Sequence, residues 1–411
     1  MTSSSSRLSP AYSSHPSLPA SSRLRPRSRG PVTFPLPRFL KAVAVVFALL
    51  ATTGWTARQS HDVPPNAWVA ALAAWEEDTF AGRELPDAGA RPDRVAAFFA
   101  SLSPGERHRL ADRHPLVVGN LGGVPVTLRY RANRAALAEA VRRERERRVD
   151  PRFSEAGRHL AGRRMNRFLS LRGEGRRILA FDPTGLGRAA EVFGDLENAE
   201  RISVVVPGAD VDLLTFERTR MKYAAPSGMA EALHAQQGRS APAVRSATIA
   251  WADYTAPRGV SVDTATGELA RAGADRLRDL LAALPGEGGI ALMCHSYGSV
   301  VCGLAAGDLP ERVTDIAVAA SPGVRAGSAR DLGEDVRVWA MRTPDDWIGD
   351  VPHLRVAGIG HGADPMSESF GARRLSTGGA TGHIDYFVPG TRSLENLAAV
   401  GTGAYHSAEL R

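Results

Sequence analysis

Gly289-Ile290-Ala291-Leu292-Met293-Cys294-His295-Ser296-Tyr297-Gly298-Ser299-Val300 is the stretch that decides the fold. The apolar residues up to Met293 predict a buried strand, and the small residues after Tyr297 predict the start of a helix. Between them, Cys294 to Gly298 match the pattern G-x-S-x-G except at the first glycine. In that pattern a sharp strand-to-helix turn exposes a serine hydroxyl at the edge of a sheet. We therefore predict that Ser296 is a nucleophile.

Apolar runs rich in β-branched residues recur after residue 177, with helical stretches between them. Several of these runs are too continuous for half-exposed strands and suit a sheet that is covered on both faces. Strands that alternate with helices predict a doubly wound, mostly parallel sheet of the α/β class. The predicted strands are Ile178–Phe181, Ile202–Val206, Ala247–Trp251, Ile290–Met293, Asp315–Ala320 and Val336–Met341, with helices at Gly267–Leu284 and Ser299–Ala306.

An acid and a base follow Ser296 in the chain. Asp345 and Asp346 come directly after the strand Val336–Met341, and His383 lies near the C-terminus. Ligands of a parallel sheet bind at the carboxyl ends of its strands. The order Ser, Asp, His is the chain order of α/β-hydrolases. An imidazole would accept the serine proton, and a carboxylate would hold that imidazole in one tautomer.

The anion formed in such a reaction needs backbone donors. We expect one to be the N–H of Tyr297, directly after the nucleophile. The other is expected from the tight bend Pro207-Gly208-Ala209-Asp210, through the N–H of Ala209.

Several of these assignments have competitors. His353, His361 and His406 also follow the acid, and His361 in Gly360-His361-Gly362 is the second choice as base. His383 is preferred because it lies in a glycine-flanked turn. Spacing does not separate Asp345 from Asp346, whereas Asp350 and Asp385 are weaker candidates. His295 adjoins the nucleophile, but its side chain is expected to point away, so we predict a structural role.

These residues resemble a family of actinobacterial α/β-hydrolase-fold proteins catalogued as domain of unknown function 1023. The family's elbow usually reads G-H-S-Y-G-S, matched by Cys294 to Ser299 except at the first position. Its acid loop commonly reads Pro-Gly-Asp-Pro, which selects Asp346, and its base resembles Gly382-His383. Other similar segments are Leu102–Pro104, Gly119–Pro125, Leu179–Pro183, Val206–Gly208, Trp251–Pro257 and Asp385–Tyr386. The resemblance covers roughly residues 90–411 and implies a serine hydrolase of no stated substrate.

The first sixty residues have a different character. Residues 1–41 form a basic, Ser- and Pro-rich tail that is predicted to be disordered, and residues 42–57 are predicted to be a hydrophobic signal or anchor segment. The positive charge before this segment predicts a body outside the cytoplasm, either secreted or anchored with the N-terminus inside. Residues 62–175 are predicted to be a helical leader, with helices at 65–80, Val95–Leu110 and Arg134–Arg148, and residues 176–411 a catalytic domain. Ser103-Pro104-Gly105-Glu106 is expected to supply a cap and first turn for the second half of Val95–Leu110.

Charge and cysteine content narrow the range of partners. Residues 129–177 carry 16 arginines against six acidic side chains, which fits a solvated helix better than a membrane-binding one. The body of the protein from Asp62 onward is mildly acidic as a whole, which argues against nucleic acid as a partner. Cys294 and Cys302, on a strand end and the following helix, are expected to be buried free thiols because this geometry is poor for a disulfide. No metal, nicotinamide or flavin motif is present, so no cofactor is expected.

The sequence thus predicts a hydrolase that acts on a small-molecule acyl substrate, with possible membrane association through residues 42–57. An inactive hydrolase-like scaffold at the cell envelope is the alternative, because fold alone does not establish activity. A peptidase or amidase would use the same three residues. The oligomeric state is not predicted.

Overall fold

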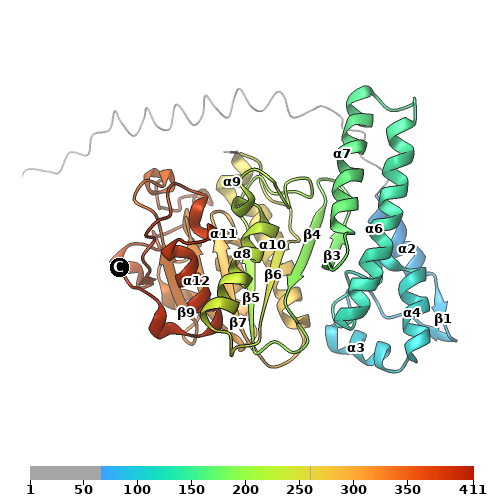
Figure 1. The fold of residues 1–411 in the computed structure, drawn as a ribbon, viewed down its shortest axis with the longest axis horizontal. Helices are drawn as coiled ribbons and strands as arrows, with labels where there is room; N and C mark the ends of the chain where they lie inside the picture. Colours follow the sequence, from blue (N-terminus) through green and yellow to red (C-terminus); the bar gives the residue numbers. More distant parts are fainter. Residues whose placement is uncertain (1–65, 260) are drawn as a thin grey trace, which may run out of the picture. The chain divides into compact units, whose positions relative to one another are not determined.

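The apolar runs in the second half of the chain form an eight-stranded sheet (Figure 1). The computed structural model describes residues 66–259 and 261–411. The strands lie in the order β10-β9-β8-β7-β5-β6-β4-β3, and all are parallel except β4, which is antiparallel to both β6 and β3. Their bounds are β3 Arg177–Asp182, β4 Arg188–Phe193, β5 Arg201–Val206, β6 Ser246–Ala252, β7 Gly289–His295, β8 Val313–Ala319, β9 Arg337–Met341 and β10 Arg373–Arg374.

The predicted mostly parallel sheet is confirmed, but β4 and β10 were not predicted from the sequence. β4 carries a buried acidic residue, Glu191, in the middle of a strand whose two ends are half-exposed. Its carboxylate accepts hydrogen bonds from Arg176 and from the Ser227 hydroxyl at 2.5 and 2.9 Å. A buried charge needs such partners, and they come from distant parts of the chain. β10 has only two residues, which is too short for a recognisable pattern.

Helices cover both faces of the sheet, as the continuous apolar strands require. α10 (Glu268–Ala283) and α11 (Gly298–Ala305) lie on one face, and α8 (Pro226–Ser240) and α12 (Arg392–Thr402) on the other. Along β5, Val204 and Val206 belong to the first core and Val205 to the second, because successive side chains of a strand point to opposite faces.

A helical region precedes the sheet, as predicted. It has a core of its own that includes Trp75, Phe99 and Leu110, and its helix α6 also contacts the edge strand β3. α6 and α7 run side by side (Figure 1). The elements are α2 Ala67–Glu76, β1 Thr79–Phe80, β2 Arg83–Glu84, α3 Pro92–Ala100, α4 Pro104–Arg113, α5 Pro115–Val118, α6 Val126–Val149 and α7 Glu155–Leu171.

The prediction over Val95–Leu110 is confirmed in part: the chain forms two helices there, α3 and α4, instead of one, and the cap expected at Ser103 is present. The break lies at Ser103, which caps α4. Its hydroxyl accepts from the N–H of Glu106, and the Glu106 carboxylate accepts from the N–H of Ser103 at 2.8 Å. This reciprocal pair satisfies N–H groups that a new helix leaves free, so it favours a fresh start over continuation.

The remaining helices are short and lie in the loops. They are α9 Val262–Thr266 and the 3-10 turns η1 Lys222–Ala224, η2 Ala306–Asp308, η3 Ala329–Leu332, η4 Trp347–Asp350, η5 Glu368–Phe370, η6 Asp385–Phe387 and η7 Tyr405–Ser407.

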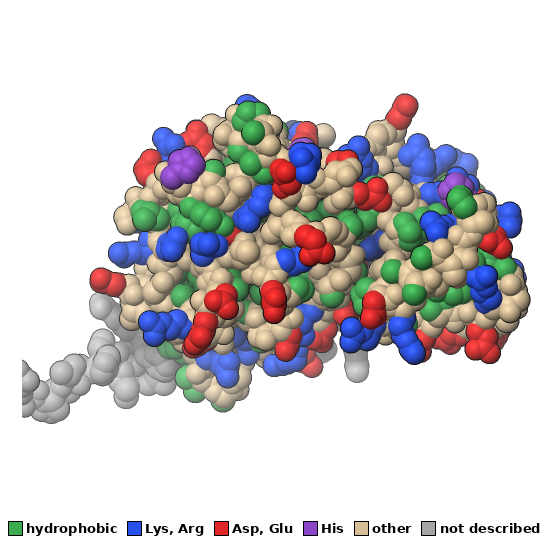
Figure 2. Space-filling model, turned by 90° about the horizontal axis from the view of Figure 1, so that it is seen from below, with side chains coloured by type: hydrophobic (Ala, Val, Ile, Leu, Met, Phe, Trp, Pro, Cys, Tyr) green, Lys and Arg blue, Asp and Glu red, His purple; other side chains and the backbone are tan. Residues whose placement is uncertain are grey.

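The predicted tail and hydrophobic segment, residues 1–41 and 42–57, lie outside the described residues. Among the helices of residues 66–411 that are described, none has the length and apolar character needed to cross a membrane. On the face seen from below, basic and acidic side chains are interspersed (Figure 2).

α11 packs closely against the loop that follows β8. A side-chain carbon on Gly303 would lie 1.9 Å from the carbonyl oxygen of Val324, which is far inside van der Waals contact. Glycine at this position therefore lets the helix after Ser296 approach the neighbouring strand end.

We predict that Gly303→Ala lowers the free energy of unfolding by about 2–3 kcal/mol, because the added methyl group forces helix and loop apart. Gly307→Ala is the matched control, since a carbon added there meets no atom within 4 Å, and it should leave stability unchanged or slightly raised. Urea unfolding of both variants gives the comparison. Equal stability of the two would contradict this account of the packing.

Candidate active site

Ser296 occupies a strained turn between β7 and α11. Its φ is 53°, in the left-handed region that residues other than glycine rarely adopt. The N–H of Ser296 donates to the carbonyl of Ala319 at the end of β8, at 2.9 Å. The helix begins two residues later, at Gly298. The turn thus places the serine at the carboxyl edge of the sheet, as the elbow pattern predicts.

The hydroxyl of Ser296 is hydrogen-bonded to His383. Ser296 Oγ lies 2.9 Å from His383 Nε2, and His383 Nδ1 lies 2.8 Å from Asp346 Oδ1. A carboxylate only accepts, so the proton of the neutral imidazole is on Nδ1 and the bare Nε2 accepts from the hydroxyl. The serine comes from the end of β7, the aspartate from the loop after β9 and the histidine from the turn before η6. The structure therefore joins the three predicted residues in one continuous series of hydrogen bonds.

Asp346 is held by more than the imidazole. Its second oxygen accepts from the hydroxyl of Tyr386 at 2.7 Å, and its first also accepts from the N–H of Ile348 at 3.0 Å. Burial raises the pKa of the Asp346 carboxyl, but the hydrogen bonds from His383, Tyr386 and Ile348 outweigh burial and bring that pKa below its ordinary value. The carboxylate is therefore ionised at neutral pH. The neighbouring Asp345 is exposed and takes no part in this series of hydrogen bonds.

His383 is also fixed through its backbone and its ring face. The Nε2–H of His295 donates to the carbonyl of His383 at 2.7 Å. The ring centroids of Trp347 and His383 lie 4.7 Å apart. Burial lowers the pKa of His295 to about 4, so this imidazole is neutral at pH 7. Sequence reasoning did not identify Trp347 or Tyr386 as neighbours of the base, although each lies within three residues of a predicted site residue.

The other histidines are engaged elsewhere. His361 donates through Nε2 to the carbonyl of Thr264 at 2.7 Å, and its ring meets the ring of Tyr297 edge to face. His353 lies near Asp364, with Nε2 at 3.7 Å from the carboxylate. The structure brings neither of these histidines to the Ser296 hydroxyl, and the remaining competitor, His406, lies in η7.

The bend after β5 lies directly beside Ser296. A side-chain carbon on Gly208 would be 2.7 Å from Ser296 Cβ and 3.1 Å from its Oγ, so only glycine fits. The hydroxyl of Tyr254 lies 2.7 Å from the carbonyl oxygen of Pro207, and the N–H of Asp210 donates to the carbonyl of Pro257 at 2.9 Å. These contacts fix the backbone on both sides of Ala209.

Comparison with known proteins gives the fold a name. A family model described as Alpha/beta hydrolase matches residues 182–356, which include Ser296 and Asp346. The sheet order and the elbow at Ser296 agree with that match. The chain has the α/β-hydrolase fold. The finer resemblance to the family catalogued as domain of unknown function 1023 stays a prediction.

Relatives and solved structures are more distant. Two uncharacterized proteins of Mycobacterium tuberculosis, from strains CDC 1551 and H37Rv, are each 27% identical over 380 residues, which cover 78% of this chain and 57% of theirs. The chain thus spans less than two thirds of the length of these curated relatives. An α/β serine hydrolase without a lid from Xanthomonas campestris is 14% identical, with a TM-score of 0.30, over 57% of this chain and 96% of that chain. The 2,6-dihydroxy-pseudo-oxynicotine hydrolase is 12% identical, with a TM-score of 0.33, over 82% and 96%.

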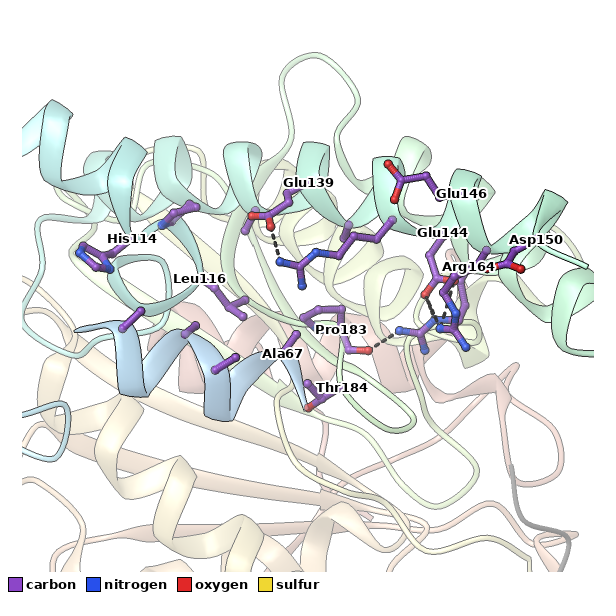
Figure 3. A pocket seen from close by; sticks show the side chains of 18 of the residues that line it. Ala67, His114, Leu116, Glu139, Glu144, Glu146, Asp150, Arg164, Pro183 and Thr184 are labelled. Carbon is purple, nitrogen blue, oxygen red and sulfur yellow. Dashed lines mark hydrogen bonds and ion pairs between the residues drawn. The ribbon is translucent and has the colours of Figure 1, made fainter. Parts of the chain in front are cut away.

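Two cavities of this α/β-hydrolase fold lie away from Ser296. One, of about 700 Å³, lies between α2 and α6, where alanines face charged side chains that pair with one another, such as Glu144 with Arg164 (Figure 3). The other, of about 860 Å³, is bordered by residues 214–222 and the start of α8. Neither is lined by Ser296, Asp346 or His383. Within the described part of the chain, no group of three or more His, Cys, Asp or Glu side chains could hold a metal ion.

The prediction that Cys294 and Cys302 are free thiols is wrong, because they form a disulfide with an S–S distance of 2.07 Å. Spacing alone predicts that Cys302 lies two turns into its helix, out of reach of Cys294. The tight turn at Ser296 instead folds α11 back along β7, and the two Cα atoms lie 6.5 Å apart, within the range of disulfides. The bond therefore joins the strand before Ser296 to the helix after it.

We predict that removing this bond in Cys294→Ala/Cys302→Ala lowers the free energy of unfolding by about 2–3 kcal/mol, since the bond closes a short loop in the unfolded chain. Urea unfolding with and without a thiol reductant measures this. The reductant should destabilise the wild type by a similar amount and leave the double variant unchanged. A wild type that is insensitive under conditions that fully reduce it would contradict the prediction.

Proposed function

We propose that the protein is a serine hydrolase that cleaves a carboxylic ester or a related acyl bond through an acyl-enzyme intermediate. One observation carries the proposal, namely the continuous hydrogen-bonded chain from Ser296 Oγ through His383 to Asp346. A serine hydroxyl is a weak nucleophile unless a base accepts its proton as it attacks. Here the base is in contact with the hydroxyl, and a buried carboxylate orients the base.

In the proposed reaction, Ser296 Oγ attacks the acyl carbon while its proton passes to His383 Nε2. Asp346 stabilises the imidazolium formed in this step. His383 then gives the proton to the departing oxygen, and the acyl group stays on Ser296. A water molecule, deprotonated by His383, attacks the acyl-enzyme and releases the acid, and the proton returns to Ser296.

The oxyanion of the tetrahedral intermediates is assigned to the N–H groups of Tyr297 and Ala209. Two observations support this assignment. Tyr297 begins the turn into α11 directly after the nucleophile, and the glycine that precedes Ala209 is in close contact with Ser296. Loss of one such donor typically costs about 3–4 kcal/mol of transition-state stabilisation.

We also propose that the protein works outside the cytoplasm. The Cys294–Cys302 disulfide supports this location, because structural disulfides persist mainly in oxidising compartments.

The direct test is hydrolysis of a soluble nitrophenyl ester by the wild-type chain and by Ser296→Ala. The variant lacks the attacking oxygen, so we expect its kcat to fall by about 10³-fold or more. Ser369→Ala is the control, since Ser369 is exposed and is not hydrogen-bonded to His383 or Asp346, and it should keep wild-type activity. Failure of the wild type to cleave esters of any chain length would favour the inactive scaffold, and cleavage of amides alone would favour the peptidase.

The acid is tested by a matched pair of neighbours. Asp346→Asn removes the charge that orients His383 and stabilises its protonated form, so we expect kcat to fall by about 10⁴-fold. Asp345→Asn makes the same change on an exposed side chain and should stay within about twofold of the wild type. Steady-state kinetics on the same ester decide between them. A large loss in Asp345→Asn and a small one in Asp346→Asn would overturn the assignment.

A further inference from the structure

Exposed apolar side chains gather near Ser296. Of the thirteen large hydrophobic residues that are exposed in the described chain, eight lie in loops at the carboxyl ends of the parallel strands, and six of these eight lie in the loops after β6, β9 and β10. These six make up what we call the apolar rim: Val262, Trp347, Leu354, Val356, Ile359 and Ile384. Exposed apolar residues that lie together mark interaction surfaces, whereas single exposed apolar residues are normal.

The rim adjoins the proposed catalytic residues. Trp347 directly follows Asp346 and its ring contacts the ring of His383, while Ile384 directly follows His383. Trp347 is 52% exposed although it packs on the base. An acyl chain that leaves the carbonyl carbon at Ser296 would therefore meet apolar surface at once.

The most exposed part of the rim is a tight hairpin. Val356 and Ile359 are joined by two backbone hydrogen bonds of 3.0 Å, and they are 66% and 59% exposed. The N–H of Gly360 donates to the carbonyl of Ala265 in α9, at 2.9 Å. His361, the next residue, packs on Tyr297 beside the nucleophile. The hairpin thus holds two aliphatic side chains in water beside the loops that carry the site.

Basic side chains lie in and beside the hairpin. Arg355 lies between Leu354 and Val356 and is exposed, as is Arg271. Arg325 supports the hairpin by donating to the carbonyls of Gly358 and Thr266. Its pKa is lowered by burial first and then by the positive charges of Arg355 and Arg271, so each of these two guanidinium groups lies near that of Arg325. Acidic residues are interspersed on the rim, at Asp263 of α9, the helix that contacts the hairpin, and at Asp345 and Asp350 around Trp347.

We propose that the apolar rim docks the protein on an anionic lipid surface, with Val356 and Ile359 among the acyl chains and the arginines at the phosphates. Apolar side chains beside basic ones are the combination that binds the interface of an anionic bilayer. The proposal rests on the proposed function and narrows it, because the substrate is then an acyl ester drawn from that surface.

The test compares two rates in the full chain. One is the hydrolysis of a long-chain nitrophenyl ester in vesicles of phosphatidylcholine and phosphatidylglycerol, and the other is that of a soluble short-chain ester. In Val356→Asp/Ile359→Asp we expect the ratio of the first rate to the second to fall at least about tenfold. In the control Val149→Asp/Leu160→Asp, with exposed side chains on α6 and α7, we expect no change. Residues 42–57 are the same in every variant, so any binding through them cancels.

An unchanged ratio in Val356→Asp/Ile359→Asp would overturn the proposal. Should that variant fail to fold, Val356→Ser/Ile359→Ser is scored in the same way. Vesicles of phosphatidylcholine alone should lower the wild-type ratio. An equal ratio in both kinds of vesicle would overturn the proposal that the surface is anionic. Dimers that the aspartate variant dissolves, without a change in ratio, would show a second copy to be the occupant and would also overturn the proposal.

A second measurement separates the rim from the chemistry. If the wild type cleaves neither ester, the proposed function fails, and the rim is then tested by quenching of tryptophan fluorescence with brominated lipid in the mixed vesicles. We expect quenching of the wild type to exceed that of Trp347→Phe, because Trp347 would lie at the lipid surface. Equal quenching of the two would show that the rim does not touch lipid.

Discussion

The backbone at Ser296 adopts a left-handed conformation, and the surrounding residues hold it there. A non-glycine residue in this region costs on the order of 1–3 kcal/mol and persists only where its neighbours determine it. Gly298 is one such neighbour, since a side-chain carbon there would lie 2.3 Å from the carbonyl oxygen of Val206. Gly208 is another, in contact with the serine itself. The Cys294–Cys302 bond then joins the two elements that the turn connects.

The base is held from several sides in the same way. Asp346 fixes one edge of the His383 ring, Trp347 contacts the ring, and His295 holds the backbone carbonyl. Tyr386 ties this cluster together, because its hydroxyl donates to Asp346 and accepts from the N–H of Thr343 at 2.9 Å. The imidazole therefore has little freedom to leave the serine, and a base that is already oriented needs no rearrangement at the moment of reaction.

Much of this arrangement could be predicted from residues that follow strands. Ser296, Asp346 and His383 lie at the carboxyl edge because the strands that precede them, β7, β9 and β10, run parallel to one another in the sheet. The mostly parallel sheet was predictable from continuous apolar runs. Adjacent residues are different. The spacings of Asp345 and Asp346 to every other motif differ by only one residue, and the contacts of Asp346 with His383 and Tyr386 distinguish the two in the fold.

Other features could not be predicted because their causes are distant in the chain. β4 contains a buried Glu191, and its hydrogen-bond partners, Arg176 and Ser227, lie outside the strand at other places in the chain. The disulfide was missed because its geometry depends on how sharply the turn at Ser296 folds the helix back, which spacing alone does not give. The apolar rim brings together residues from three loops that are far apart in the chain, so no local pattern in the sequence indicates it.

The central claim is that Ser296 is the attacking group, and identification of the residue that a fluorophosphonate modifies tests it most directly. The full chain is labelled with the probe, digested, and the modified residue is located by mass spectrometry. We expect a single adduct on Ser296 in the wild type and on Ser369→Ala, and none on Ser296→Ala. An adduct on another residue, or labelling that persists in Ser296→Ala, would contradict the account.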